Sequence, residues 1–271
     1  MIDLRSQLLG SAPGAAENFD EGVRMCRLAA AEGVRASVAA VRWAAGASEP
    51  PLEFDAYARE LERLRAASEV EHELLAGFVL SFHENLPALV AHYGQQLALA
   101  GGRSLLVALP ALEVSACVEG VWDALKAMGF RVVVARPECS PALRRDAARL
   151  DAWVANGVTV QLDAASVTGA HGREALRFAR RCAKEYAPLG RLAIASNACD
   201  AGPRRPSLKA AFDEIARTHG PRVARSLVSD VPRKLLEGGT RGGEFLSAAS
   251  RRRAWGWPLR FPWGKTLPEE S

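Results

Sequence analysis

Arginine and amide side chains recur in short polar segments that each accompany an apolar run of the sequence. The segments are Ile2–Gln7, Val41–Trp43, Gly94–Leu97, Ala135–Glu138 and Ala195–Cys199. If each apolar run is a strand of an alternating β/α chain, the segments meet at one end of the sheet, where such folds bind ligands. Because guanidinium groups hold phosphate and carboxylate through paired hydrogen bonds, the pattern predicts a pocket for a phosphate, phosphotyrosine or uronate group.

A structural interpretation of the same arginines is equally open. Unpaired buried cations are costly, so arginines at such a mouth need partners. The arginines at issue are Arg5, Arg42, Arg136 and Arg205, and the nearby carboxylates that could neutralise them are Glu138, Asp163 and Asp200.

The elements that would position these segments alternate along the chain. Short apolar runs at 36–41, 104–109, 132–135, 158–162 and 192–195 predict strands, and helical spacing is found at 19–30, 54–64, 117–128, 143–154, 176–186 and 208–215. Asn18 and Ser140 are predicted helix caps. We place the third strand within residues 86–99, whereas residues 68–82 show no clear period. Alternation of strands with helices predicts an α/β fold with a parallel sheet.

The order and setting of the polar segments resemble the PHP (polymerase and histidinol phosphatase) superfamily and, within it, the bacterial capsule-type protein-tyrosine phosphatases. The shared frames are Ile2-Asp3-Leu4, Tyr93-Gly94-Gln95, Pro137-Glu138, Ser196 with Ala198, Arg205-Pro206, and residues 161–169 and 226–232. The resemblance covers residues 1–238. It implies an α/β fold, a distorted (β/α)7 TIM-like barrel forming a single domain over residues 1–239, and a metal-dependent phosphatase activity.

The metal-ligand positions of that family are changed in this sequence. Arg5, Gln7, Arg42, Arg136 and Cys199 stand where the family has histidines, and Gln96 and Asn197 replace a Glu and an Asp. Divalent metals need neutral imidazoles and ionised carboxylates, whereas arginine offers only donors. We therefore predict no cofactor, with the family's Mn, Fe or Zn lost. The chain is then a pseudo-phosphatase with a binding or regulatory role in capsular or exopolysaccharide tyrosine-kinase signalling, and its expected partner is a phosphotyrosine protein or a tyrosine kinase.

An alternative is an active phosphatase with a rebuilt, metal-poor or cysteine-based site. Cys199 and Arg205 have the Cys-x5-Arg spacing in which a thiolate attacks phosphate, and Cys139 and Arg145 repeat it. Nearby arginines could lower a thiol pKa. Prolines interrupt both loops, and the spacing arises easily in an arginine-rich chain.

Composition bounds the remaining possibilities. Five cysteines without paired metal spacing, and no signal or membrane-spanning run, predict a cytoplasmic protein. A formal charge of +4 gives no reason to expect nucleic acid. Residues 240–271 form a basic, tryptophan-rich tail that either packs on the barrel or contacts the inner-membrane surface through 251–263. His92 and His171 are expected at the mouth as hydrogen-bonded loop residues.

Overall fold

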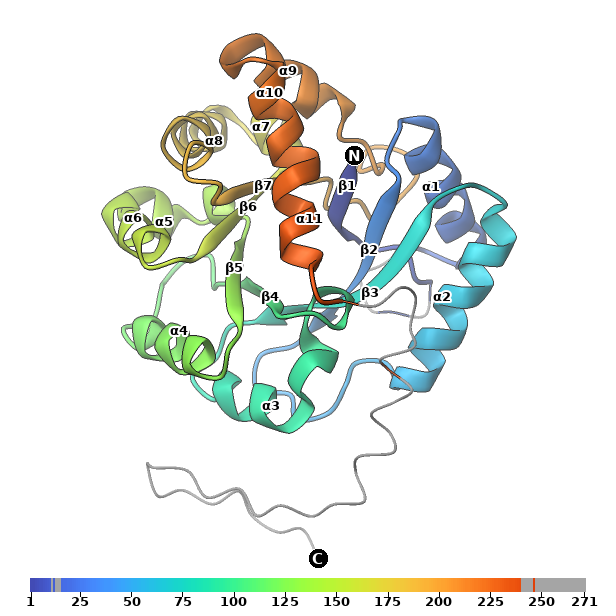
Figure 1. Ribbon diagram of the computed structural model, residues 1–271, viewed down its shortest axis with the longest axis horizontal. Coiled ribbons are helices and arrows are strands. Elements are labelled where there is room, and N and C mark those ends of the chain that lie inside the picture. Colours follow the sequence, from blue (N-terminus) through green and yellow to red (C-terminus); the bar gives the residue numbers. More distant parts are fainter. Residues whose placement is uncertain (11, 13–15, 240–245, 247–271) are drawn as a thin grey trace, which may run out of the picture.

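The computed structural model describes residues 1–10, 12, 16–239 and 246, in which seven parallel strands form one sheet (Figure 1). The strands are β1 (Ile2–Ser6), β2 (Ala36–Trp43), β3 (Glu73–Ser81), β4 (Ser104–Ala108), β5 (Arg131–Ala135), β6 (Thr159–Asp163) and β7 (Leu192–Ala195). They lie side by side in sequence order. Parallel neighbours need a crossover between them, and the predicted helical segments supply these crossovers.

The sheet closes into a barrel between its first and last strands. Ser6 forms an isolated parallel bridge with Ala198. The Gln7 N–H donates to the Ala198 carbonyl over 2.7 Å, and the Asn197 N–H donates to the Arg5 carbonyl over 3.0 Å. The predicted single-domain, seven-stranded α/β barrel is therefore confirmed.

Helices surround the barrel and cover one of its ends (Figure 1). They are α1 (Phe19–Ala31), α2 (Phe54–Ser68), α3 (Leu86–Tyr93), α4 (Val118–Ala127), α5 (Pro141–Arg145), α6 (Ala147–Ala155), α7 (Ala164–Thr168), α8 (Arg173–Tyr186), α9 (Lys209–His219), α10 (Pro221–Arg225) and α11 (Val231–Leu236). The Ser104 hydroxyl at the start of β4 donates to the Leu235 carbonyl over 2.7 Å. α11 thus covers the amino ends of the strands, and the carboxyl ends are left for a ligand to reach the barrel interior.

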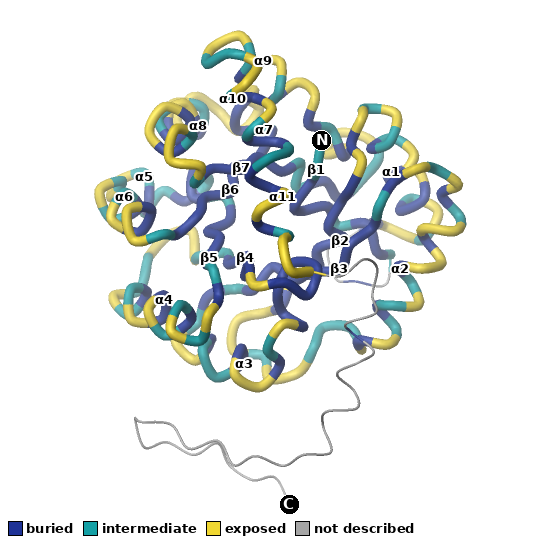
Figure 2. The backbone as a smooth tube through the Cα atoms, in the orientation of Figure 1, coloured by how far each residue is buried: buried dark blue, intermediate teal, exposed yellow. Residues whose placement is uncertain are grey.

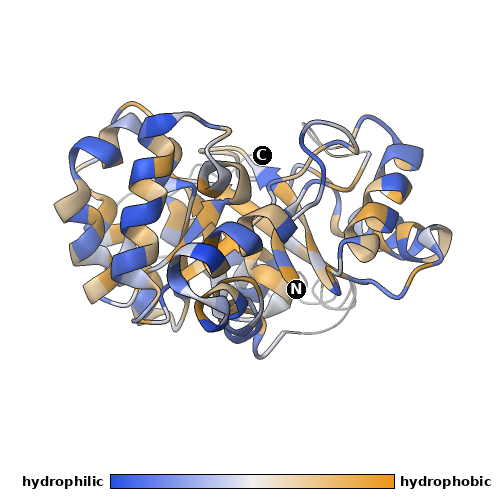
Figure 3. Cartoon of the chain, turned by 90° about the horizontal axis from the view of Figure 1, so that it is seen from above, coloured by the Kyte–Doolittle hydropathy of each residue, from blue (hydrophilic) through white to orange (hydrophobic). Residues whose placement is uncertain are grey.

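Two apolar layers hold the barrel together. The strands alternate between a small interior cluster and a larger layer packed against the helices. The interior cluster includes Leu4, Val38, Val79, Leu106, Val133 and, from α11, Leu235. The outer layer contains the large aromatic side chains Trp43, Phe78, Trp122 and Trp153. Figure 2 shows that the strands are buried and that the outer faces of the surrounding helices are exposed. In Figure 3 the strands are largely hydrophobic, whereas the helices carry hydrophilic residues as well.

Both predicted helix caps are present. The Asn18 side chain accepts from the Glu21 N–H at the start of α1, and the Ser140 hydroxyl accepts from the Leu143 N–H at the start of α5. The helix predicted over 143–154 is interrupted, because the Asp146 side chain accepts from the Arg149 N–H and starts α6 as a separate helix. Asp competes for backbone hydrogen bonds in this way, which favours caps over helix interiors.

The predicted place of the third strand is wrong. Residues 86–93 form α3 and 94–97 a 3-10 turn, whereas the third strand, β3, lies at Glu73–Ser81. All but the two end residues of β3 are buried. A parallel strand buried on both faces reads as a continuous apolar run without a period of two, so its pattern does not separate it from a helix.

The predicted tail, residues 240–271, lies outside the described residues except for Leu246. Its role and the domain boundary at 239 stay predictions.

Candidate anion site at the barrel mouth

A cavity of about 450 Å³ opens at the carboxyl ends of the strands. Six of the eight predicted site residues line it: Arg5, Gln7, Arg42, Arg136, Asn197 and Arg205. Gln96 and Cys199 are not among its lining residues. Four of the five polar segments therefore belong to strand ends, and the Gly94–Leu97 segment does not.

A change of register in β1 brings Arg5 to the cavity. Asp3 pairs with Ser37, but Ser6 pairs with Ala39, so β1 has one residue more than β2 over this stretch. Bulges of this kind re-aim side chains beside functional sites. The sequence gives no local signal for this bulge.

Arg5 is a buried cation that forms no ion pair with any residue that the structure describes. Only 4% of the residue is exposed, and its Nε is buried with no hydrogen-bond partner among residues 1–10, 12, 16–239 and 246. Burial lowers the pKa of Arg5 to about 10, and repulsion from Arg42 and Arg136 acts in the same direction. Since a buried charge is stable only when it is paired, Arg5 is suited to an anionic ligand.

Arg136 has its own carboxylate partner. It follows β5 in the left-handed region, with φ of 53°, which directs the chain sharply into the Pro137–Cys139 turn. Its Nε lies 3.0 Å from Asp163 Oδ2 as an ion pair, although the angle is not that of a hydrogen bond. Burial alone would lower the pKa of Arg136, and the Asp163 carboxylate raises it above its ordinary value instead.

The three arginines nearer the surface differ in their partners. Arg204 pairs with Asp200 over 3.3 Å, and Arg205 lies 3.8 Å from Glu32. Arg42 is exposed and forms no ion pair with any described residue. Asp163, one of the carboxylates predicted to neutralise the mouth, pairs with Arg136. Asp200, another of them, pairs with Arg204, which was not among the four arginines named in that prediction.

Two buried carboxyl groups lie close to these cations. Burial raises the pKa of Asp3 to about 6, although Asp3 accepts hydrogen bonds from the Ser196 hydroxyl and from the backbone of Ser196 and Arg5. Burial raises the pKa of Glu138 to about 7, and its Oε2 has no partner in the described structure. Glu138 therefore keeps its proton to a higher pH than an ordinary glutamate does.

Gln96 and the residues after β3 show where the third segment belongs. The Gln96 amide donates to the Leu246 carbonyl over 3.4 Å, away from the cavity lining. The residues that follow β3 are Phe82, His83 and Glu84. The sequence signal for this strand end is the apolar run of residues 74–80. A run of this kind without alternation is typical of a strand that is buried on both faces.

The Cys199–Arg205 loop does not favour thiolate chemistry. Cys199 is buried, its Sγ lies 3.9 Å from the Asp200 carboxylate, and burial raises the pKa of the thiol. Cys139 is better placed, because Arg136 Nη2 donates to its Sγ over 3.3 Å and His171 Nδ1 lies 3.8 Å away. Burial nevertheless raises the pKa of Cys139 as well.

His171, Arg204 and Ser196 line the cavity but were not predicted as ligand-binding residues. His171 Nδ1 lies 3.0 Å from the Ser166 hydroxyl and 3.8 Å from Asp163. Its place after the Thr168-Gly169 turn was the available signal. His92, expected at the mouth as well, packs its ring against Tyr93 and is not in the lining.

The side chains at the mouth do not fit a metal. Among the described residues no group of three or more His, Cys, Asp or Glu could hold an ion. The carboxylates that are present are engaged, Asp3 with Ser196 and Asp163 with Arg136. Arginine cannot coordinate a cation, and three arginines so close would repel one.

A seven-stranded α/β barrel with its cavity at the carboxyl ends of the strands is the architecture of the PHP class. A family model described as "Capsular polysaccharide synthesis, CpsB/CapC" matches residues 1–237, and the chain therefore belongs to this family. The predicted family resemblance is confirmed.

Solved structures show the same fold. One is described as YwqE from Bacillus subtilis and CpsB from Streptococcus pneumoniae, unique metal-dependent tyrosine phosphatases, with 21% identity, a TM-score of 0.79, and coverage of 90% of this chain and 98% of that chain. Another is the phosphotriesterase from Mycobacterium tuberculosis, with 16% identity, a TM-score of 0.53, and coverage of 90% and 94%. A comparison with curated proteins gave no match. In the described residues no helix is long and apolar enough to cross a membrane.

Proposed function

We propose that this CpsB/CapC-family chain is a catalytically degenerate member that binds a phosphorylated or otherwise acidic group at the barrel mouth. The observation that carries the proposal is Arg5, a nearly fully buried residue in a cavity lined by further arginines, whose Nε has no hydrogen-bond partner in the described part of the chain. A dianion would supply the missing acceptor through charge-assisted hydrogen bonds.

The charge balance of the cavity supports an anion. Its lining contains five arginines and one carboxylate, Asp163. Three of these arginines have carboxylate partners, whereas Arg5 and Arg42 form no ion pair with a described residue. Glu138 offsets Arg5 only in part, because burial raises the pKa of this carboxyl to about 7.

The same residues disfavour metal-dependent hydrolysis. The family's reaction needs a metal to lower the pKa of a bound water and generate hydroxide. Here Arg5, Arg42 and Arg136 occupy the positions where the family resemblance implies histidine ligands. Arginines at these positions bind an anionic group but do not generate the hydroxide that would attack it.

Binding is tested by calorimetry with sulfate, which stays a dianion over the working pH range, and with phosphotyrosine. Arg42→Gln should weaken binding by about fivefold, the loss of one exposed charge contact. Arg222→Gln, which removes an exposed charge from α10, is the matched control and should leave the affinity unchanged. No saturable binding by the unchanged protein, or equal losses in both variants, refutes the anion site.

Catalysis is tested separately on the same preparation. Elemental analysis should find no stoichiometric Mn, Fe or Zn, and hydrolysis of a phosphotyrosine substrate should not rise when Mn²⁺ is added. Near-stoichiometric metal together with Mn-dependent turnover would show that the chain is a working metal phosphatase.

The biological setting follows from the family. We propose a regulatory role in capsular or exopolysaccharide tyrosine-kinase signalling, with a phosphotyrosine protein or a tyrosine kinase as partner. Cytoplasmic localisation, with peripheral contact at the inner membrane through residues 251–263, belongs to the same proposal. Co-sedimentation with anionic liposomes, compared between the full chain and a variant that ends at residue 239, tests the membrane contact; equal binding by the two refutes it.

An active phosphatase with a rebuilt site is the alternative, and the contact between Arg136 and the Cys139 thiol favours this position over Cys199. Phosphatase activity that is independent of metal and lost in Cys139→Ser would support it. Activity that persists in both Cys139→Ser and Cys199→Ser excludes a cysteine nucleophile at these positions.

A further inference from the structure

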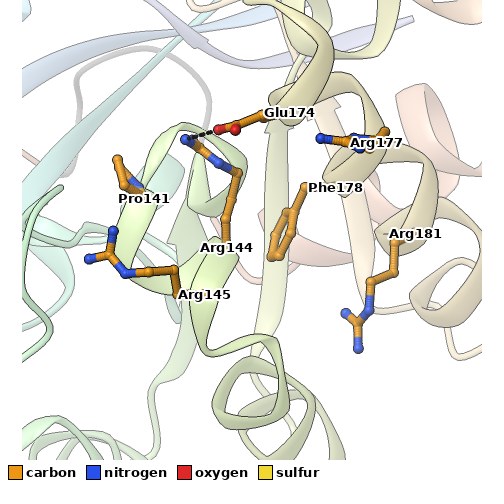
Figure 4. Close-up of a pocket in the computed structure, with 7 residues that line it drawn as sticks. All are labelled: Pro141, Arg144, Arg145, Glu174, Arg177, Phe178 and Arg181. Carbon is orange, nitrogen blue, oxygen red and sulfur yellow. Dashed lines mark hydrogen bonds and ion pairs between the residues drawn. The ribbon is translucent and has the colours of Figure 1, made fainter.

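A second cavity, of about 510 Å³, lies on the outer wall of the barrel between α5 and α8 (Figure 4). Its charged lining residues are Arg144 and Arg145 from α5 and Glu174, Arg177 and Arg181 from α8. Phe178 gives it an apolar surface and is itself only 6% exposed. We call this cavity the α5/α8 groove.

Two of the four arginines in the groove already have carboxylate partners. Arg144 Nη2 lies 2.9 Å from Glu174 Oε2, and Arg144 Nη1 donates to the Glu138 carbonyl over 3.0 Å. Arg181 pairs with Asp151 and donates to the Tyr186 hydroxyl. These contacts fix the walls of the groove and leave it with a net positive charge.

Arg145 and Arg177 are the free cations of the groove. Both are exposed, and neither forms an ion pair or a side-chain hydrogen bond within the described part of the chain. They come from different helices, and Figure 4 shows Phe178 between the arginines of α5 and Arg181. Guanidinium groups spread around an apolar ring suit a ligand with several separated negative charges better than they suit one small anion.

We propose that the α5/α8 groove binds an acidic peptide segment, rich in Asp and Glu, of a partner protein. The volume lies in the range of ligand-binding clefts and accommodates a few side chains. The groove is a hollow between two helices, a shape that fits an inserted peptide better than a flat bilayer surface, and the small exposed part of Phe178 lies in its lining. This site is separate from the barrel mouth, because no residue lines both cavities.

The test uses the full chain and a fluorescein-labelled acidic peptide of Asp, Glu and Leu, followed by anisotropy at low and at physiological ionic strength. The double variant R145A/R177A should bind about tenfold more weakly, as expected for two exposed ion pairs. The control R222A/R225A removes two exposed charges from α10 and should change the affinity by less than about twofold. At constant ionic strength, excess sulfate, which is the ligand proposed for the mouth, should not displace the peptide.

Each contrary outcome overturns the proposal. Absence of peptide binding by the unchanged chain, or equal losses in the two double variants, means that the groove is not a peptide site. Vesicles containing phosphatidylglycerol provide the second arm: binding to them that depends on Arg145 and Arg177, without peptide binding, assigns the groove to a membrane surface instead. Displacement by sulfate at constant ionic strength would place the peptide at the mouth.

Discussion

Replacing Glu138 by glutamine should change how the stability of the protein depends on pH. Burial raises the pKa of Glu138 from its ordinary 4.5 to about 7 in the folded protein. The folded state therefore binds this proton more tightly than the unfolded state does. Between pH 4.5 and about 7 the folded state holds more protons, so the free energy of unfolding falls as the pH rises. At about 1.4 kcal/mol for each pH unit, the loss is roughly 3 kcal/mol.

The measured quantity is the difference in free energy of unfolding between Glu138→Gln and the unchanged protein. Any fixed cost of the substitution, such as an altered contact with the Asp163 N–H, shifts this difference by a constant. Ionisation of Glu138, in contrast, makes this difference in free energy of unfolding vary with pH. The difference should move in favour of Glu138→Gln by about 3 kcal/mol between about pH 4.5 and about pH 7.5. Asp3, whose pKa is also raised, titrates in both proteins and cancels.

Urea unfolding followed by tryptophan fluorescence gives both free energies, since Trp43, Trp122 and Trp153 are buried. Glu113→Gln replaces an exposed glutamate and is the control, with a difference that should stay constant. If the difference for Glu138→Gln varies by less than about 0.5 kcal/mol over this range, burial does not govern the ionisation of Glu138, and the reasoning is refuted.

Two further predictions concern the scaffold that supports the mouth. Tyr57 on α2 accepts from the Gly77 N–H over 2.8 Å and donates to the Ala39 carbonyl, so Tyr57→Phe should cost about 1–3 kcal/mol in urea unfolding; a cost near zero would contradict this reading of the hydroxyl. Gly22→Ala should destabilise by about 2 kcal/mol or more, because the added Cβ would clash with the Leu8 carbonyl oxygen. A gain in thermal stability, the usual result of Gly→Ala in an exposed helix, would show that α1 can shift.

Strand ends, caps and the arginines of the mouth were predictable because their signals are local. Apolar runs bounded by helical segments located β2, β4, β5, β6 and β7, and polar residues at the ends of four of them, β2, β5, β6 and β7, line one cavity. β3 was misplaced, because its buried apolar run has no alternating pattern and the equally apolar α3 after it was taken as the strand. The misplacement carried Gln96 into the predicted site, although Gln96 lies on a 3-10 turn after α3.

The sequence by itself determined the alternation of strands and helices and the family. It also carries the prediction that arginines and amides stand in place of ligand-type side chains. Tertiary structure alone decided which arginine has a carboxylate. Arg136 has Asp163 at 3.0 Å, while the Nε of Arg5 has no partner among the described residues. It also raised the pKa of Asp3 and Glu138 and placed α5 beside α8 to form the outer groove. The physical reason is that burial and charge pairing depend on residues distant in sequence, whereas strand and helix patterns are carried by neighbours.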